Sequence, residues 1–207
     1  MKIGIMGGTF DPIHNGHLML GRYARDLFAL DEVWFMPNGN PPHKADDSIE
    51  AMTTHRAEMV RRAITGESDF RLQLYEVNRN EVNYSYLTME HFKTCYPEDE
   101  FYFIIGSDSL FTIETWKCPD RLLKSCIVLA AYRDGKKKQE MEDQIQHLNQ
   151  TYEADVRLLN TPDVDISSTE IRERIKEGLP VDGMIPEVVY DYICENHLFG
   201  EEDNHAI

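Results

Sequence analysis

The chain alternates between short apolar runs and longer segments with helical spacing, and few fold classes accommodate such an alternation. The apolar, β-branched or aromatic runs cover residues 2–6, 33–36, 70–75, 101–105, 127–131 and 156–159. Between them, apolar residues recur with helical spacing over about 16–29, 53–65, 85–96 and 137–150. Strands that alternate with helices are joined by right-handed crossovers, which place the strands parallel in one sheet. The sequence therefore predicts an α/β fold built on a doubly wound parallel sheet.

The end of the chain departs from this alternation. From about residue 160, two helical stretches, 168–177 and 186–196, follow each other with no apolar run between them. We therefore expect a single domain over 1–207, in which about 1–160 form the core and about 161–200 form a small C-terminal helical appendage.

The composition fits a soluble globular protein and disfavours several function classes. Hydrophobic residues make up 42% of the 207 residues, and the formal net charge is −16. This charge repels nucleic acids and anionic membranes. No segment approaches the roughly 18 uninterrupted apolar residues of a membrane helix, and Gly7 and Asp11 interrupt any signal peptide. We expect a cytoplasmic protein that binds neither nucleic acid nor membrane, and leave open whether it forms a homo-oligomer.

The four cysteines also favour a reducing compartment. They stand far apart and form no C-x-x-C pair, so a thiolate metal site is not expected. Unpaired thiols in the cytosol are the simplest interpretation.

Residues with chemical functions gather directly after the predicted strands. In doubly wound sheets, ligands bind outside the carboxyl ends of the strands, where the strand order reverses. The segments found there are GGTFDPIHNGH (7–17), PNGNPPHK (37–44), GSDS (106–109), AYRDG (131–135) and TPDVDISSTEIR (161–172). They carry Lys44, Arg133 and Arg172, so an acidic protein can still present a basic pocket to an anion at this edge.

The segment 7–17 is suited to a phosphate. Gly7 and Gly8 lack the Cβ atoms that would keep a ligand from the main chain, and Gly16 opens a helix whose N-terminus attracts anions. His14 and His17 are three residues apart and point in similar directions on that helix. A metal pair is an alternative, although two histidines alone rarely hold zinc and no third ligand is obvious. Another alternative is that both histidines only cap the helix or pack in the core.

The segment 166–172, ISSTEIR, contains a capping box. Ser167 can bond the start of the following helix while Glu170 reaches back to it. The alternative to a functional site is simply a well-capped helix. Arg172 favours a site, because it lies one turn into the helix, near another N-terminus that attracts anions.

Taken together, these motifs resemble the HxGH superfamily of nucleotidyltransferases and, within it, the bacterial nicotinate-nucleotide adenylyltransferase family. The similar segments are GGTFDPIHNGH, WFMPNGNPPHK, FIIGSDS followed by Trp116, and ISSTEIRERI, in the family's order and spacing. HNGH alone would not separate this family from phosphopantetheine adenylyltransferases or class I aminoacyl-tRNA synthetases. The PPHK segment and Trp116 make that distinction.

The resemblance implies a Rossmann-like nucleotidyltransferase fold and an activity. Members transfer the adenylyl group of ATP to nicotinate mononucleotide, giving deamido-NAD and pyrophosphate without a covalent enzyme intermediate. Mg²⁺ would be carried by the ATP phosphates, so no protein ligand is assigned to it. Catalysis would then depend on alignment of the substrates and neutralisation of phosphate charge.

The resemblance also implies the residues that handle ATP. His17 would donate to the α-phosphate in the transition state, and His14 would contact the same phosphate region. The full ATP-binding set that it implies is Gly7, Gly8, Thr9, Phe10, Gly16, His17, Gly106, Asp108, Arg133, Ser167, Ser168 and Arg172.

For the mononucleotide, the resemblance implies a second group of residues. Trp116 would stack on the pyridine ring, unless it is a half-buried core tryptophan, and Ser85 would lie near the pyridine carboxylate. Lys44 would pair with the phosphate, and Asp108 would accept hydrogen bonds from ribose. Lys117 stands where relatives often have an aromatic residue, which leaves open the preference between carboxylate and carboxamide.

Two alternatives differ from this activity. The same chemistry could act on nicotinamide mononucleotide or phosphopantetheine, although Trp116 and the PPHK segment disfavour the latter. A nucleotide-binding sensor without catalysis would retain the fold, but loss of a catalytic histidine would be expected, and both histidines are present.

Overall fold

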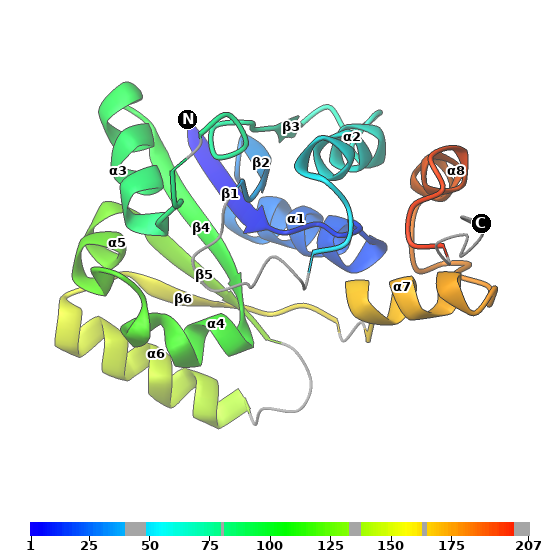
Figure 1. Cartoon of the computed structure of the whole chain (residues 1–207). Helices are drawn as coiled ribbons and strands as arrows, with labels where there is room; N and C mark the ends of the chain where they lie inside the picture. Colours follow the sequence, from blue (N-terminus) through cyan, green and yellow to red (C-terminus); the bar gives the residue numbers. More distant parts are fainter. Residues whose placement is uncertain (40–48, 80, 133–137, 163–164, 201–207) are drawn as a thin grey trace.

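The computed structural model describes residues 1–39, 49–79, 81–132, 138–162 and 165–200. Its centre is a sheet of six parallel strands in the order β3-β2-β1-β4-β5-β6 (Figure 1). The strands are β1 (Lys2–Gly8), β2 (Glu32–Pro37), β3 (Phe70–Leu72), β4 (Glu100–Gly106), β5 (Ile127–Ala131) and β6 (Val156–Leu159). The predicted doubly wound parallel sheet is confirmed.

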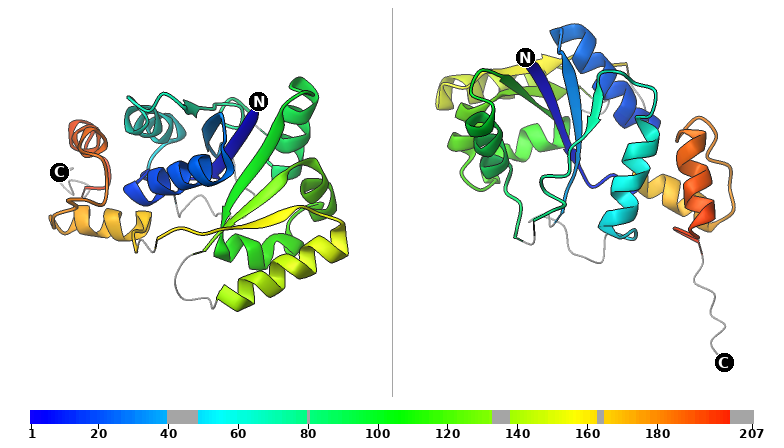
Figure 2. Two further views of the ribbon diagram at one scale, coloured as in Figure 1. Left: turned by 180° about the vertical axis from the view of Figure 1, so that it is seen from behind. Right: turned by 90° about the horizontal axis from the view of Figure 1, so that it is seen from above.

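Helices cover both faces of this sheet (Figure 2). One face packs against α1 (Asn15–Phe28) and α2 (Thr53–Ala63). The other face packs against α3 (Ser85–Cys95), α4 (Ser107–Thr112), α5 (Pro119–Ser125) and α6 (Lys138–Tyr152). The predicted helices over 16–29, 53–65, 85–96 and 137–150 correspond to α1, α2, α3 and α6, with small differences at their ends.

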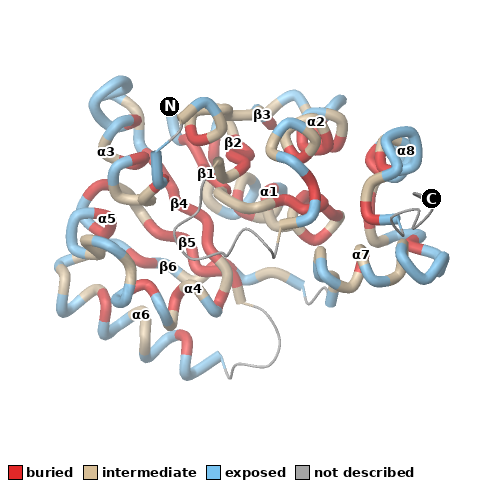
Figure 3. Tube along the Cα trace, in the orientation of Figure 1, coloured by how far each residue is buried: buried red, intermediate tan, exposed pale blue. Residues whose placement is uncertain are grey.

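The side chains of the central strand β4 are buried on both faces of the sheet. Phe101, Phe103 and Ile105 belong to the core beneath α3 to α6, whereas Tyr102 and Ile104 belong to the core beneath α1 and α2. Successive side chains of a strand point to opposite faces, so a strand that is apolar throughout is buried on both. Figure 3 shows this burial along the sheet and the exposed outer sides of α3 and α6.

The C-terminal part places α7 (Ser168–Lys176) and α8 (Glu187–Glu195) at one end of the molecule, beyond α1 and α2 (Figure 1). Val189 and Ile193 of α8 are buried in the same core cluster as α2. His55 Nδ1 of α2 lies 2.8 Å from the Tyr192 hydroxyl, and the Arg62 guanidinium lies 4.4 Å from the centre of that ring. α8 therefore packs against α2 through apolar and polar contacts.

The sequence interpretation and the structure differ at two places. The predicted strand over 70–75 ends at Leu72, because the main chain turns: Tyr75 N donates to the Gln73 side chain at 3.1 Å. After β4, the structure has α4, a 3-10 turn η2 (Ile113–Thr115) and α5, which the sequence analysis did not predict. They are six, three and seven residues long, too short for periodicity to identify them.

The strand order reverses at β1, and the sheet opens there. β1 pairs with β2 as far as Gly8 and Pro37, but with β4 only as far as Met6 and Ile104. A crevice therefore begins at the carboxyl end of β1, where ligands bind in doubly wound sheets. In the part of the chain that the structure describes, no helix is long and apolar enough to cross a membrane.

Candidate active site

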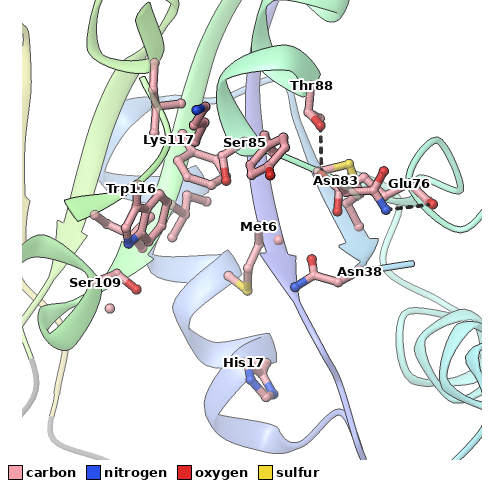
Figure 4. A pocket seen from close by; sticks show the side chains of 18 of the residues that line it. Met6, His17, Asn38, Glu76, Asn83, Ser85, Thr88, Ser109, Trp116 and Lys117 are labelled. Carbon is pink, nitrogen blue, oxygen red and sulfur yellow. Dashed lines mark hydrogen bonds between the residues drawn. The ribbon is translucent and has the colours of Figure 1, made fainter. Parts of the chain in front are cut away.

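A cavity of about 350 Å³ lies at this opening (Figure 4). Its walls come from the ends of β1, β2 and β4, from the start of α3 and from the segment after η2. Trp116 and Lys117 stand on one side and Asn38, Glu76 and Asn83 on the other, with Met6 between them and His17 of α1 nearby. Among the predicted site residues, the cavity brings together Gly7, His17, Ser85, Gly106 and Trp116. Asp108, Ser167, Ser168 and Arg172 are not among the residues that line it.

Two glycines at this edge are not explained by close packing. A Cβ atom at Gly7 would meet its nearest neighbour, Asn38 Oδ1, only at 3.8 Å, and at Gly106 it would meet no atom within 4 Å. Both residues line the cavity. Main-chain atoms that are open in this way can be approached closely by a ligand.

The absence of a side chain at Gly8 has a different reason, because the ring of Phe10 occupies the space beside it. A Cβ atom at Gly8 would lie 3.0 Å from the ring of Phe10. Phe10 has a positive φ of 52° and its side chain is buried. Its ring meets the ring of His17 edge-on at 5.0 Å. Phe10 therefore supports His17 from within the core.

The histidine pair occupies the start of α1 with the two rings stacked, 3.6 Å between centres. His14 is buried, whereas His17 is partly exposed and lines the cavity. The main-chain N–H of His14 donates to His17 Nδ1 at 3.3 Å. Because Nδ1 accepts this bond, the neutral His17 ring carries its proton on Nε2 and has a donor there.

The N-terminus of α1 is partly occupied by the C-terminal segment. The main-chain N–H of Asn15 donates to Met184 O at 2.8 Å, and its side chain donates to Gly183 O at 2.8 Å. The N–H of His17 bonds His14 O at 2.9 Å. This helix start therefore offers a phosphate fewer amides than a bare terminus would.

The start of α7 faces the loop after β1. Ser167 caps the helix by accepting from Glu170 N at 3.1 Å, which is one half of the predicted capping box, whereas the Glu170 carboxylate accepts from Arg174 at 3.5 Å. Ser168 Oγ donates to Pro12 O at 2.9 Å. Arg172 donates to Asp11 O at 2.8 Å and to Glu50 Oε1 at 3.1 Å. Ser168 and Arg172 thus hold the main chain of the segment that follows β1.

Glu50 joins this group from the segment before α2. It accepts from Lys176 Nζ at 2.8 Å as well as from Arg172. Burial works to raise the pKa of Glu50, but the hydrogen bonds from Lys176 and Arg172 outweigh it and lower the pKa overall. The carboxylate therefore stays ionised and fixes the position of Arg172.

Among the residues expected to hold the mononucleotide, Ser85 and Trp116 line the cavity. The Trp116 ring is partly buried and meets Phe103 edge-on at 6.5 Å, so it belongs to the edge of the core and to the cavity wall together. Asp108 is exposed in the first turn of α4, and the cavity wall passes through its neighbour Ser109. Lys44 and Arg133, with His43, lie outside the described residues.

The chain is similar in sequence to known proteins of one family. The chain matches the cytidylyltransferase-like family over residues 5–174. It is 40% identical over 198 residues to a protein of Carboxydothermus hydrogenoformans named "Probable nicotinate-nucleotide adenylyltransferase". The matched region covers 96% of this chain and 98% of that protein. A protein of the same name from Clostridium kluyveri is 41% identical over 202 residues, covering 96% and 99%. The chain belongs to the nicotinate-nucleotide adenylyltransferase family.

The fold of this family member is also found in a solved structure. Plasmodium falciparum nicotinic acid mononucleotide adenylyltransferase, complexed with NaAD, superposes with a TM-score of 0.77 over 96% of this chain and 97% of that one. At 23% sequence identity, this likeness concerns the fold.

Two buried polar residues of this adenylyltransferase family member were not expected from its sequence. Arg56 of α2 and Glu76, after β3, are 1% and 5% exposed. Burial raises the pKa of the Glu76 carboxyl, and the hydrogen bond from Thr88 at 2.8 Å and the charge of Arg79 offset only part of this effect. Glu76 shapes the cavity wall, since its main-chain O accepts from Asn83 Nδ2 at 3.1 Å.

No group of three or more His, Cys, Asp or Glu side chains is placed to hold a metal ion within the described ranges.

Proposed function

We propose that this protein transfers the adenylyl group of ATP to nicotinate mononucleotide, giving deamido-NAD and pyrophosphate for the synthesis of NAD. Its family supports this proposal, as do the P. falciparum neighbours solved with NaAD and with APC. The observation that carries the proposal is the position of the His17 side chain. Its ring lines a cavity at the strand-order reversal, beside the open main chain of Gly7, with a donor on Nε2.

The reaction needs no nucleophilic side chain. A phosphate oxygen of the mononucleotide attacks the α-phosphorus of ATP, and the bond from that phosphorus to the oxygen bridging the β-phosphate breaks in line. Negative charge grows on the α-phosphate oxygens, where the Nε2–H of His17 would donate. His14, stacked behind His17 at 3.6 Å, would hold the ring in place. The protein supplies alignment and charge neutralisation.

The ATP phosphates would lie against the end of β1, where Gly7, Gly8, Thr9 and Phe10 follow the last pairing with β4. Magnesium would enter with ATP as part of the substrate. Gly106 would allow the adenosine to approach β4, and Asp108, in the first turn of α4, would accept a hydrogen bond from a ribose hydroxyl.

The nicotinate ring would occupy the side of the cavity that Trp116 and Ser85 line. Stacking on the Trp116 face would orient the ring. The Ser85 hydroxyl and the Lys117 ammonium would face the carboxylate from two directions. Lys117 thereby favours an acidic acceptor over its amide.

Small-molecule ligands also agree with the acidic composition. A net charge of −16 opposes contact with nucleic acids, and the four unpaired cysteines favour a reducing compartment, so we infer a cytoplasmic enzyme of small substrates.

A pyrophosphate-release assay with ATP and Mg²⁺ tests the function. It compares nicotinate mononucleotide, nicotinamide mononucleotide and phosphopantetheine as acceptors at equal concentrations. We expect release with the first at a much higher kcat/KM than with the other two. Binding of ATP without release from any acceptor would instead indicate a nucleotide sensor, and faster release with phosphopantetheine would reassign the acceptor.

A further inference from the structure

Arg56 heads the largest side chains that are fully buried among the described residues, and it does not line the cavity. Burying a guanidinium costs free energy unless hydrogen bonds and an opposite charge compensate for it. Burial lowers the pKa of Arg56, and the carboxylate of Asp11 opposes this effect. A guanidinium buried at this cost is expected to hold specific partners in place.

The guanidinium of Arg56 joins the segments that follow β1 and β2. Nη1 donates to Thr9 O at 2.6 Å, and Nη2 donates to Asn38 O at 2.8 Å and to Thr53 Oγ1 at 3.0 Å. A planar guanidinium presents these donors in a fixed fork, whereas an ammonium group would not. One buried side chain of α2 thus clamps the ends of two neighbouring strands.

This clamp determines which way the peptide groups face. In a trans peptide, the C=O and the following N–H point in opposite directions. Gly8 O accepts from Asn38 N at 2.9 Å, and Thr9 O accepts from Arg56. The N–H groups of Thr9 and Phe10 therefore point away from β2 and α2. Beyond Met6, β1 has no pairing with β4, so these amides point to the side on which the sheet is open.

Asp11 completes the arrangement. Its carboxylate accepts from Glu50 N at 2.8 Å and from Ala51 N at 3.1 Å, just before α2 begins. It thereby fixes the start of the helix that carries Arg56 and balances the charge of the guanidinium.

We propose that Arg56 is a positioning residue, which holds the carbonyls of Thr9 and Asn38 so that the amides of Thr9 and Phe10 face the phosphates of the nucleotide. This role rests on the proposed function, because the phosphates are those of its substrate. Arg56 touches no substrate; it acts through the main chain that does.

The test compares Arg56→Lys and Arg56→Gln with the same two changes at Arg61. Arg61 lies on the same helix, is exposed and pairs with Glu58 at 2.5 Å. Displacing reacting groups by about 1 Å can cost about 100-fold in rate. We expect kcat per folded molecule, at saturating substrates, to fall about 100-fold for both Arg56 variants and to stay unchanged for both Arg61 variants. A merely structural role would lower the melting temperature while leaving that kcat intact.

Hydrogen exchange provides a second measurement, which the wild-type protein alone can supply. Because Arg56 is buried and bonded, its guanidinium protons should exchange far more slowly than those of Arg61. Pyrophosphate should shift the amide signals of Thr9 and Phe10 in the NMR spectrum. If the Arg56 variants do not fold, these two observations decide the proposal.

Failure of the positioning role and failure of the proposed function give different results. An Arg56→Lys variant within threefold of the wild-type kcat, or Arg56 protons that exchange as fast as those of Arg61, would overturn the positioning role. Pyrophosphate that leaves the Thr9 and Phe10 amide signals unchanged would overturn it as well. A wild-type protein that releases no pyrophosphate with any acceptor would overturn the proposed function, whereas slow exchange at Arg56 would still show the clamp.

Discussion

The starts of α1 and α7 were expected to do the same work, and the structure gives them different surroundings. At α1, the His17 ring lines the cavity and its Nδ1 is fixed by a main-chain N–H. At α7, the side chains of Ser168 and Arg172 donate to the main chain of Pro12 and Asp11. One helix start contributes a side chain to the cavity wall, and the other holds the loop that follows β1.

This difference shows that a helix start rich in donors can bond the main chain of a neighbouring loop instead of lining the cavity. The triphosphate role of Ser167, Ser168 and Arg172 stays a prediction, but their present partners are protein atoms. A nucleotide would have to share Arg172 with Asp11 and Glu50. Substitutions at the two helix starts should therefore differ in whether they change turnover, affinity or stability.

The largest effect is expected for His17→Ala. Losing one donor to the transition state should lower kcat by about 10²–10³, because the charge on the α-phosphate is then no longer neutralised by this group. The melting temperature should change little, since His17 is only partly buried. Steady-state pyrophosphate release checks this. His91→Ala, at an exposed histidine of α3, is the control. A kcat near that of the wild type would remove His17 from the catalytic site.

Arg172→Ala should have the next largest effect. If Arg172 meets the triphosphate, ATP binding should weaken about tenfold, which corresponds to one charge-assisted hydrogen bond of about 1.5 kcal/mol. Arg174→Ala is a matched control on the same helix, where the side chain pairs with Glu170 at 3.5 Å. Titration calorimetry measures both. Equal ATP affinities for the two variants would leave Arg172 only its present role, that of holding the loop.

How far these roles follow from the sequence depends on the range of the interaction. The alternation of runs predicted the parallel sheet, and GGTFDPIHNGH predicted a ligand site with His17 in it, because both patterns are local. Arg56 was not identified, since its two carbonyl partners lie 47 and 18 residues away in the chain. The spacing of α2 does place Arg56 on the face of Met59, Val60 and Ala63 and leaves Arg61 off that face, but it does not identify the carbonyls that Arg56 bonds.

The same limit applies to Glu76 and to the bracing of the loop by α7. Glu76 lies in a segment without helical or strand periodicity, so its burial could be found only from the fold. Ser168 bonds Pro12 across 156 residues, and Arg172 bonds Asp11 across 161. Donor-rich residues after a strand predict polar contacts, but they do not say whether the partner is a ligand or the protein itself.

Ser167→Ala and Ser168→Ala should separate helix capping from loop bracing. Removing the Ser167 cap should cost about 1 kcal/mol, which lowers the melting temperature by about 2–4 °C for a chain of this size, with unchanged kcat. Ser168→Ala should cost a similar amount of stability and should also raise the KM for ATP, because Pro12 O loses its donor. Thermal unfolding and pyrophosphate release measure both variants. Identical kinetics for the two would mean that Ser168 does not brace the loop.

The smallest effect is expected for Glu50→Gln, and it depends on pH. Because the pKa of Glu50 is lowered in the folded protein from its ordinary 4.5, its ion pairs add stability above that value and lose it as the pH falls through the folded-state pKa. At pH 7 the variant should lose at most about 1 kcal/mol, since Glu50 is about one-third exposed. Urea unfolding at pH 7 and in mild acid should show the difference shrinking toward zero. Glu81→Gln, at a carboxylate that is 77% exposed, should show almost no difference at either pH. A difference that persists in acid would mean that Glu50 acts on α7 through packing and not through its charge.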